Sequence, residues 1–181
     1  MYRKLVVIGG VGAGKSTLIR TLSEIETVDT DVKTSQDIGK PVTTVGIDYG
    51  RITLGKEEAI GLYGVPGQER YSFIWDMVKE DVWGCALLLN SKSIPSADKL
   101  FRLLNVFINN KPDLPLVIGV THSDIMSVDF NQIRAAFSRR GLNPPIFSVD
   151  ARKKESSLLL LHTLMSLHTA KHTLGDTAEY E

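Results

Sequence analysis

The chain has 181 residues, enough for one well-buried domain and too few for two comfortable ones. Hydrophobic residues make up 43% and charged residues 23%, which are ordinary globular values, and the formal net charge is zero. A neutral chain gives no electrostatic reason to bind nucleic acid or an anionic membrane. No apolar run reaches the ~20 residues of a membrane span, and neither end carries a lipidation motif. We therefore expect no nucleic-acid partner and no intrinsic membrane anchor.

The only cysteine, Cys85, lies inside the apolar run 84–89 and is expected to be a small core residue. A lone cysteine cannot form an intramolecular disulfide, which suits a reducing compartment. The first residues run directly into an apolar stretch, so no signal peptide is visible. Together these features predict a cytoplasmic protein.

The first half of the chain predicts three strands and one helix. Residues 5–8 are typical of a buried strand, and the residues from Ser16 to Ile25 of a helix. The polar stretch 26–44 lacks apolar periodicity, and a loop of this length in a compact domain is usually functional or mobile. Residues 45–54 alternate as a strand does, a turn follows, and 59–63 form a second strand, which together predict an antiparallel hairpin.

The second half alternates regularly between strands and helices. Strands are expected over 85–89, 116–120 and 146–149, and helices over 96–108, 129–139 and 156–172. This alternation predicts an α/β fold with a mostly parallel six-stranded sheet, one antiparallel edge hairpin and helices on both faces. We expect a single domain over residues 1–174 and a frayed acidic tail over 175–181.

The segment between the first strand and the first helix carries the most specific pattern in the chain. It matches G-x-x-x-x-G-K-[ST] and reads Gly9, Gly10, Val11, Gly12, Ala13, Gly14, Lys15, Ser16. Its glycines let backbone N–H groups turn toward phosphate oxygens. Lys15 is placed to reach the β- and γ-phosphates, and the Ser16 hydroxyl to bind Mg²⁺. The pattern therefore predicts a loop that, with Thr17, binds a nucleoside phosphate.

The order of motifs resembles the Ras-like small GTPases from about Arg3 to His172. Within them it looks closest to a prokaryotic branch, the gliding-motility (MglA-type) and roadblock-associated GTPases. Besides the phosphate loop, the resemblance rests on four segments: 43–48 as the first switch, 65–70 as the second switch, 121–124 in place of N-K-x-D, and 150–152 in place of S-A-K. It implies a P-loop NTPase fold of the Ras-like G-domain type, binding GTP or GDP with Mg²⁺.

The resemblance also implies residue roles. Thr44 and Ser16 would hold Mg²⁺, and the γ-phosphate would draw Thr44 and the Gly67 amide inward. Gln68 would orient the attacking water. Asp124 would accept two hydrogen bonds from guanine, a donor pair that adenine lacks. The other expected nucleotide-binding residues are Thr121, His122, Asp150, Ala151 and Arg152.

Three departures from the family pattern affect the chemistry. Gly64 stands where most members have an aspartate that holds a Mg²⁺-bound water, and an acid of the 29–37 loop or Asp48 would have to replace it. Val11 stands where many members have glycine, so its branched side chain crowds Gln68 and predicts slow unaided hydrolysis. His122 and Thr121 replace a lysine and an asparagine, which leaves guanine selectivity mainly to Asp124.

Several clusters have alternative interpretations. The aromatic segment Tyr71, Phe73, Ile74, Trp75 and Met77 is expected to be a partner surface, because one short helix cannot bury five large groups on one face. Phe101, Leu104 and Phe107 are expected in the core. His168 and His172 have the spacing of a metal pair, but no third ligand is evident. Arg51 could supply a catalytic arginine by analogy with relatives.

Three functions follow. The first is a GTP-binding switch whose slow GTP hydrolysis is stimulated by a partner at the two switches. The resemblance implies that this partner is a roadblock-type dimer and that the switch acts in prokaryotic polarity, motility or signalling. The second is a GTP-dependent binding module with negligible turnover, which Gly64 and Val11 favour. The third, a nucleotide or small-molecule kinase, needs an arginine-bearing lid, and no such insertion follows residue 89.

Overall fold

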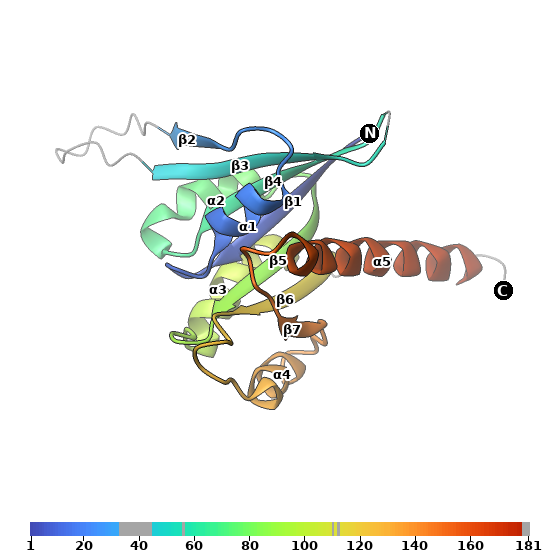
Figure 1. Cartoon of the computed structure of the whole chain (residues 1–181). Helices are drawn as coiled ribbons and strands as arrows, with labels where there is room; N and C mark the ends of the chain where they lie inside the picture. The colour runs from blue at the N-terminus through green and yellow to red at the C-terminus, as the bar shows by residue number, and fades with distance from the viewer. Residues whose placement is uncertain (33–44, 56, 110, 112, 179–181) are drawn as a thin grey trace.

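A computed structural model describes residues 1–32, 45–55, 57–109, 111 and 113–178. Helices and strands alternate along most of the chain (Figure 1). In chain order they are β1 (Tyr2–Gly9), α1 (Lys15–Leu22), β2 (Val28–Val32), β3 (Val45–Thr53), β4 (Ala59–Pro66), the 3₁₀ turn η1 (Glu69–Tyr71), α2 (Ser72–Val78), β5 (Val82–Asn90), α3 (Ala97–Ile108), β6 (Leu116–Thr121), α4 (Phe130–Ser138), β7 (Ile146–Ser148) and α5 (Lys154–Ala178).

The sheet confirms the predicted α/β class. Its order is β2-β3-β4-β1-β5-β6-β7, and the five strands from β4 to β7 are parallel. β3 runs antiparallel to β4, which is the predicted hairpin. All six expected strands are present, and a seventh, β2, pairs antiparallel with β3 at the edge. Sequence analysis placed β2 in a loop because its sequence, VDTDV, is too polar to stand out as a strand.

Helices cover both faces of the sheet, and each face has its own core (Figure 1). Successive residues of β1 point to opposite faces, so Leu5 and Val7 pack with α1 and α5, whereas Val6 and Ile8 pack with α2, α3 and α4. A strand buried on both faces needs a continuous apolar sequence, which explains the run at 5–8. The predicted core residues of α3 are confirmed, since Phe101, Leu104 and Phe107 are all buried.

The aromatic segment after β4 is mostly core, which corrects the expected partner surface. Ile74 and Trp75 are buried, and the Trp75 indole donates a hydrogen bond of 2.7 Å to the Pro66 carbonyl. Tyr71 and Phe73 are partly buried against the same core, and Met77 alone of the five is exposed. Tyr71 lies on η1, so only four of the five side chains belong to the helix α2.

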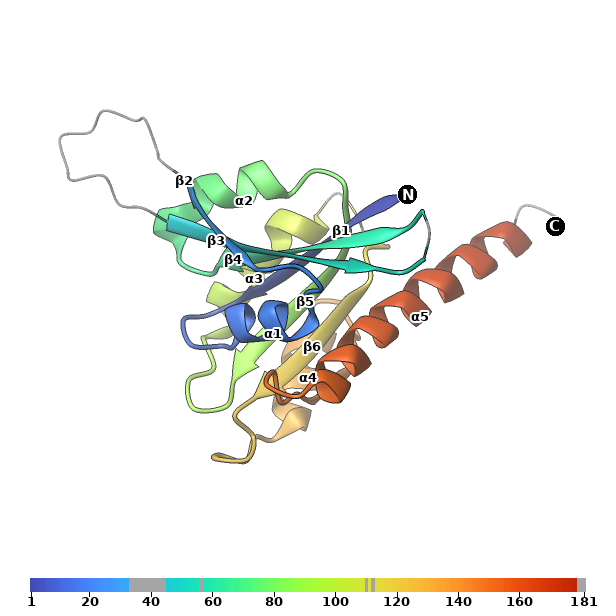
Figure 2. The same ribbon diagram turned by 45° about the horizontal axis from the view of Figure 1, so that its top comes forward.

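Helix α5 is longer than expected and continues to Ala178, so four residues of the predicted tail are helical. At 1.5 Å per residue its 25 residues span roughly 37 Å, and its last turns project beyond the sheet (Figure 2). Residues 179–181 lie outside the described ranges. Among the helices that the structure describes, none combines the length and the apolar content that a bilayer span requires.

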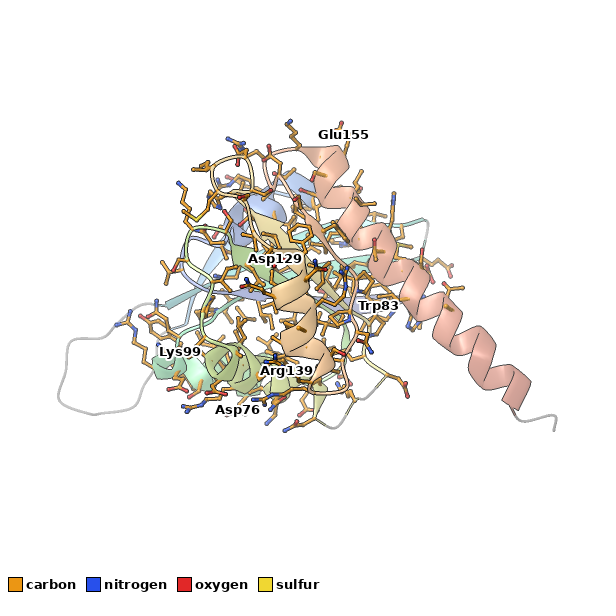
Figure 3. The ribbon with its side chains drawn as sticks, turned by 90° about the horizontal axis from the view of Figure 1, so that it is seen from below. Asp76, Trp83, Lys99, Asp129, Arg139 and Glu155 are labelled. Carbon is orange, nitrogen blue, oxygen red and sulfur yellow. The ribbon has the colours of Figure 1, made fainter. Side chains whose placement is uncertain are left out.

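His168 of α5 packs against the sheet. Its ring meets the Trp83 ring edge-on, with centroids 5.2 Å apart, and Figure 3 labels Trp83 beside α5. The side chain of His172, the other member of the candidate metal pair, lies outside the described part. Across the described residues, no group of three His, Cys, Asp or Glu side chains is arranged to hold a metal ion.

Two neighbouring leucines of α5 give a matched test of this packing. Leu160 is fully buried, whereas Leu159 is 51% exposed. Leu160→Ala should lower the free energy of unfolding by roughly 2–5 kcal/mol, because it removes buried methyl groups and leaves a cavity. Leu159→Ala should change it by less than about 0.5 kcal/mol. Urea unfolding of both variants measures the difference, and equal effects would contradict the placement of α5.

Candidate functional site

The sequence motifs converge on the edge of the sheet where the parallel strands end. The loop after β1 begins at Gly10, the second-switch segment follows Pro66 of β4, and the T-H-S-D segment begins at Thr121 of β6. The loop at 150–152 follows β7. In open α/β sheets, ligands bind at this edge, in the crevice beyond the carboxyl ends of the strands.

The phosphate loop has the backbone conformation that its glycines predict. Gly12 and Gly14 have φ values of 69° and 91°, in the left-handed region that favours glycine, and Gly14 caps α1. The Lys15 ammonium donates hydrogen bonds of 3.0 Å to the carbonyls of Gly9 and Gly10. Burial lowers the pKa of Lys15, and the Asp48 carboxylate partly opposes this shift. A buried cation at a helix N-terminus is well suited to a polyanion.

An acid, Asp48, lies across from Gly64 on the neighbouring strand. Asp48 on β3 lies directly opposite Gly64 on β4, and its Oδ2 accepts a hydrogen bond of 2.6 Å from the Ser16 hydroxyl. A Cβ atom at position 64 would lie 2.9 Å from that oxygen and 2.8 Å from the Ile19 methyl. An aspartate at position 64 and one at position 48 would therefore compete for the same space.

The second-switch segment touches the phosphate loop. A Cβ atom at Gly67 would lie 2.6 Å from the Gly9 carbonyl oxygen, so only glycine allows the two loops to approach this closely. Gln68 follows at once and is partly buried at the start of η1. Thr44, the expected residue of the first switch, lies outside the described residues.

A cavity of about 600 Å³ opens next to the phosphate loop and contains the expected base-binding residues. Thr17 of α1 lines it on the side of the phosphate loop, and Thr121, His122, Asp124, Asp150, Ala151 and Arg152 line the remainder with several neighbours. A space of this size lies within the range of cavities that bind small molecules. The sequence therefore predicted a group of residues that the fold does bring together.

Thr121 braces the phosphate loop even though it replaces an asparagine. Its hydroxyl is buried, 3.0 Å from the Ala13 carbonyl and 3.3 Å from the Leu89 carbonyl, and it donates to one of them at a time. The Nδ1 atom of His122 lies 3.1 Å from the same hydroxyl. One residue therefore both contacts the phosphate loop and lines the cavity.

The mouth of the cavity carries an ion cluster. Arg152 donates from Nε and Nη2 to the two carboxylate oxygens of Asp150, at 2.8 and 3.0 Å, and its Nη2 lies 3.6 Å from Oδ2 of Asp124. These hydrogen bonds hold the pKa of Asp150 down at about 2 and raise the pKa of Arg152. Figure 3 labels Glu155, another lining residue, at the first turn of α5.

Arg51 lies far from the phosphate loop. On β3 it is opposite Gly61, at the level of Lys4 on β1, and Lys4 is five residues before Gly9. The separation along the strand is roughly 17 Å. In this arrangement Arg51 cannot reach a γ-phosphate, and a catalytic role would require β3 to move.

Sequence analysis missed three polar residues that support the site. The Asn90 amide donates to the Gly12 carbonyl, the Thr21 hydroxyl donates to the Ala151 carbonyl, and the Ser156 hydroxyl accepts from the Asp150 N–H. Asn90 could have been found, because it is the polar residue that ends a buried parallel strand. Thr21 and Ser156 have no sequence signal, since their roles depend on how α1 and α5 pack.

The residues around Ser16 fit Mg²⁺. The Ser16 hydroxyl and the Asp48 carboxylate supply hard oxygen atoms within 2.6 Å of each other, next to the loop that would hold phosphates. Mg²⁺ characteristically binds through one or two protein oxygens together with substrate phosphates and water. This pattern needs no cluster of three acidic or histidine ligands.

Comparison with known proteins adds one finding on the fold. No protein-family model matches the chain, and no curated protein matches it in sequence. Among solved structures, it is similar to the G domain of the FeoB iron transporter of T. maritima, with a TM-score of 0.62 and 16% identity. The match covers 92% of this chain and 99% of the other. This chain therefore has the fold of a G domain, a P-loop NTPase fold.

Proposed function

We propose that this chain is a guanine-nucleotide-binding switch that hydrolyses GTP slowly. One observation carries the proposal: the phosphate loop and a base-sized cavity that contains Asp124 adjoin each other, joined by the Thr121 hydroxyl. The Asp124 carboxylate can accept hydrogen bonds from the N1–H and the 2-amino group of guanine. Adenine offers no such pair, so this residue would select the base.

Residues at the phosphate end would hold the nucleotide and its metal. The loop N–H groups and Lys15 would bind the phosphates, while Ser16 and Asp48 would hold Mg²⁺ directly or through water. Mg²⁺, when bound, neutralises charge that develops on the phosphates. Gln68 would orient the attacking water, from a position next to the contact between Gly67 and Gly9.

A partner that stimulates hydrolysis is part of the proposal, by resemblance to the gliding-motility GTPases. Such a partner, which by this resemblance would be a roadblock-type dimer, would contact the two switches. Ile74 and Trp75 are buried, so a contact at the second switch would involve the exposed residues Glu69, Arg70 and Met77 instead. A role in prokaryotic polarity, motility or signalling would follow from that partner.

A second function remains, that of a GTP-dependent binding module without appreciable turnover. Val11, 74% exposed in the phosphate loop, favours it. Its branched side chain would crowd Gln68 and an incoming arginine as they approach the γ-phosphate.

Titration calorimetry of nucleotide-free protein with GDP and with ADP, each in Mg²⁺, tests the base assignment. GDP should bind roughly a hundredfold more tightly than ADP, a difference of about 2.7 kcal/mol. In Asp124→Asn the new amide can donate to a 2-oxo group, so affinity should move from GDP toward xanthosine diphosphate. Equal binding of GDP and ADP to the unaltered chain would end the guanine proposal.

Asp48→Ala tests the metal assignment. The loss of this carboxylate should raise the Mg²⁺ concentration needed to retain GDP by roughly tenfold to a hundredfold. A fluorescent GDP analogue released during a Mg²⁺ titration measures it. Asp98→Ala is a matched control, because Asp98 is exposed on α3 and pairs only with Arg140 in the described structure. An unchanged Mg²⁺ requirement in Asp48→Ala would contradict the role of Asp48.

Single-turnover hydrolysis of GTP separates the two functions. Gln68→Ala should slow the reaction by roughly tenfold or more, because the attacking water loses its orientation. Val11→Gly should accelerate it several-fold by relieving the crowding. If neither the unaltered chain nor Val11→Gly releases phosphate, with or without candidate partners, the binding module is the better description.

A further inference from the structure

Four charged side chains meet at the mouth of the base cavity, two carboxylates and two cations, and the Lys153 ammonium lies 4.0 Å from Oδ2 of Asp150. Asp124 and Asp150 are both carboxylates, and the guanidinium of Arg152 lies between them. Its Nη2 atom is 3.0 Å from Oδ2 of Asp150 and 3.6 Å from Oδ2 of Asp124. A single nitrogen therefore links the base-reading carboxylate to a second acid of the neighbouring loop.

Asp150 is fixed, so it can act as an anchor for Arg152. The Asp150 N–H donates to the Ser156 hydroxyl of α5, and its Oδ1 accepts from the backbone N–H of Arg152 as well as from Nε. The bidentate pair of hydrogen bonds from Nε and Nη2 of Arg152 to the Asp150 carboxylate also fixes the plane of the guanidinium. The low pKa of Asp150, about 2, keeps this acid ionised at neutral pH.

Without the arginine, this arrangement would weaken base recognition. Two carboxylates in adjacent loops repel each other, and the repulsion would turn Asp124 away from Asp150. This change would remove an acceptor from the pair that guanine requires. A lysine would replace the arginine only in part. Its ammonium is a point charge and cannot donate two parallel hydrogen bonds to Asp150 while it also lies next to Asp124.

We propose that Arg152 is a positioning residue for the base reader: anchored on Asp150, it orients the Asp124 carboxylate so that both oxygens can accept from guanine. The inference rests on the proposed guanine site and extends it to specificity. Arg152 acts through Asp124 here and need not touch the base.

Inosine diphosphate provides the readout that separates positioning from general charge. Its base keeps the N1–H of guanine and lacks the 2-amino group, so the ratio of GDP to IDP affinity measures the second hydrogen bond to Asp124. Loss of a positive charge alone would weaken both nucleotides equally, because both carry the same diphosphate. Loss of Asp124 orientation should weaken GDP more and reduce the ratio.

The test is calorimetry of GDP and IDP with four variants of the full chain. In Arg152→Gln the GDP/IDP affinity ratio should fall by roughly fivefold or more, and Arg152→Lys should restore only part of it. In Asp150→Ser/Arg152→Gln the repelling acid is also gone, so the ratio should return to within about twofold of the unaltered chain. Lys154→Gln removes a charge from the first residue of α5, which in the described structure neither lines the cavity nor pairs with Asp150, and it should leave the ratio unchanged.

Two results would overturn the inference while leaving the guanine site intact. One is an unaltered GDP/IDP ratio in Arg152→Gln when the unaltered chain prefers GDP. The other is a double variant no better than Arg152→Gln. If the unaltered chain binds neither nucleotide, the proposed function fails and the inference fails with it. Arg152 is 71% exposed, so its variants should unfold at the same temperature as the unaltered chain, which circular dichroism verifies.

Discussion

The parallel order of the strands determines where chemistry can occur in this molecule. Five neighbouring strands run in the same direction, so the loops that follow them all leave from one edge of the sheet. Segments that are 130 residues apart in the sequence become neighbours in this way, as the hydrogen bond between Thr21 of α1 and the Ala151 carbonyl illustrates. These strands are buried and closely packed on both faces, and this packing fixes the spacing between the phosphate loop and the base cavity. Sequence changes in the loops can then alter the chemistry without changing this frame.

Asp48, the acid near Ser16, shows that sequence changes can also involve residues on the strands. A carboxylate beside Ser16 can come from either of two adjacent strands, because residues paired across strands have side chains on the same face. In this chain β3 supplies it as Asp48 and β4 has glycine opposite. A Cβ atom at position 64 would lie 2.9 Å from Oδ2 of Asp48, so an acid on one strand disfavours an acid on the other. Gly64 and Asp48 are therefore one coupled feature, and Gly64 alone does not indicate a degenerate site.

The sequence predicted the parts of the structure that rest on local patterns. Continuous apolar runs identified the buried strands, and the spacing of Gly12, Gly14 and Lys15 identified the phosphate loop, because backbone conformation and apolar burial are encoded where they occur. Strand β2 was missed because its pairing with β3 stabilises it and its own composition does not. Trp75 was misplaced because its burial depends on the Pro66 carbonyl, nine residues earlier, accepting its indole N–H. In the base cavity, the motif located Asp124, Asp150 and Arg152, but their distances depend on the loops after β6 and β7 and have no sequence signal.

The charges at this edge are arranged so that ligand and fold are thermodynamically linked. Burial of Lys15 penalises its charged form, and the contact with Asp48 offsets only part of that penalty. A polyphosphate would offset much of the remainder, because it is an anion of high charge surrounded by backbone donors. Any ligand that binds the folded chain and not the unfolded one stabilises it by an amount that grows with concentration. A phosphate loop built around a partly buried cation is thus less stable alone than with its anion.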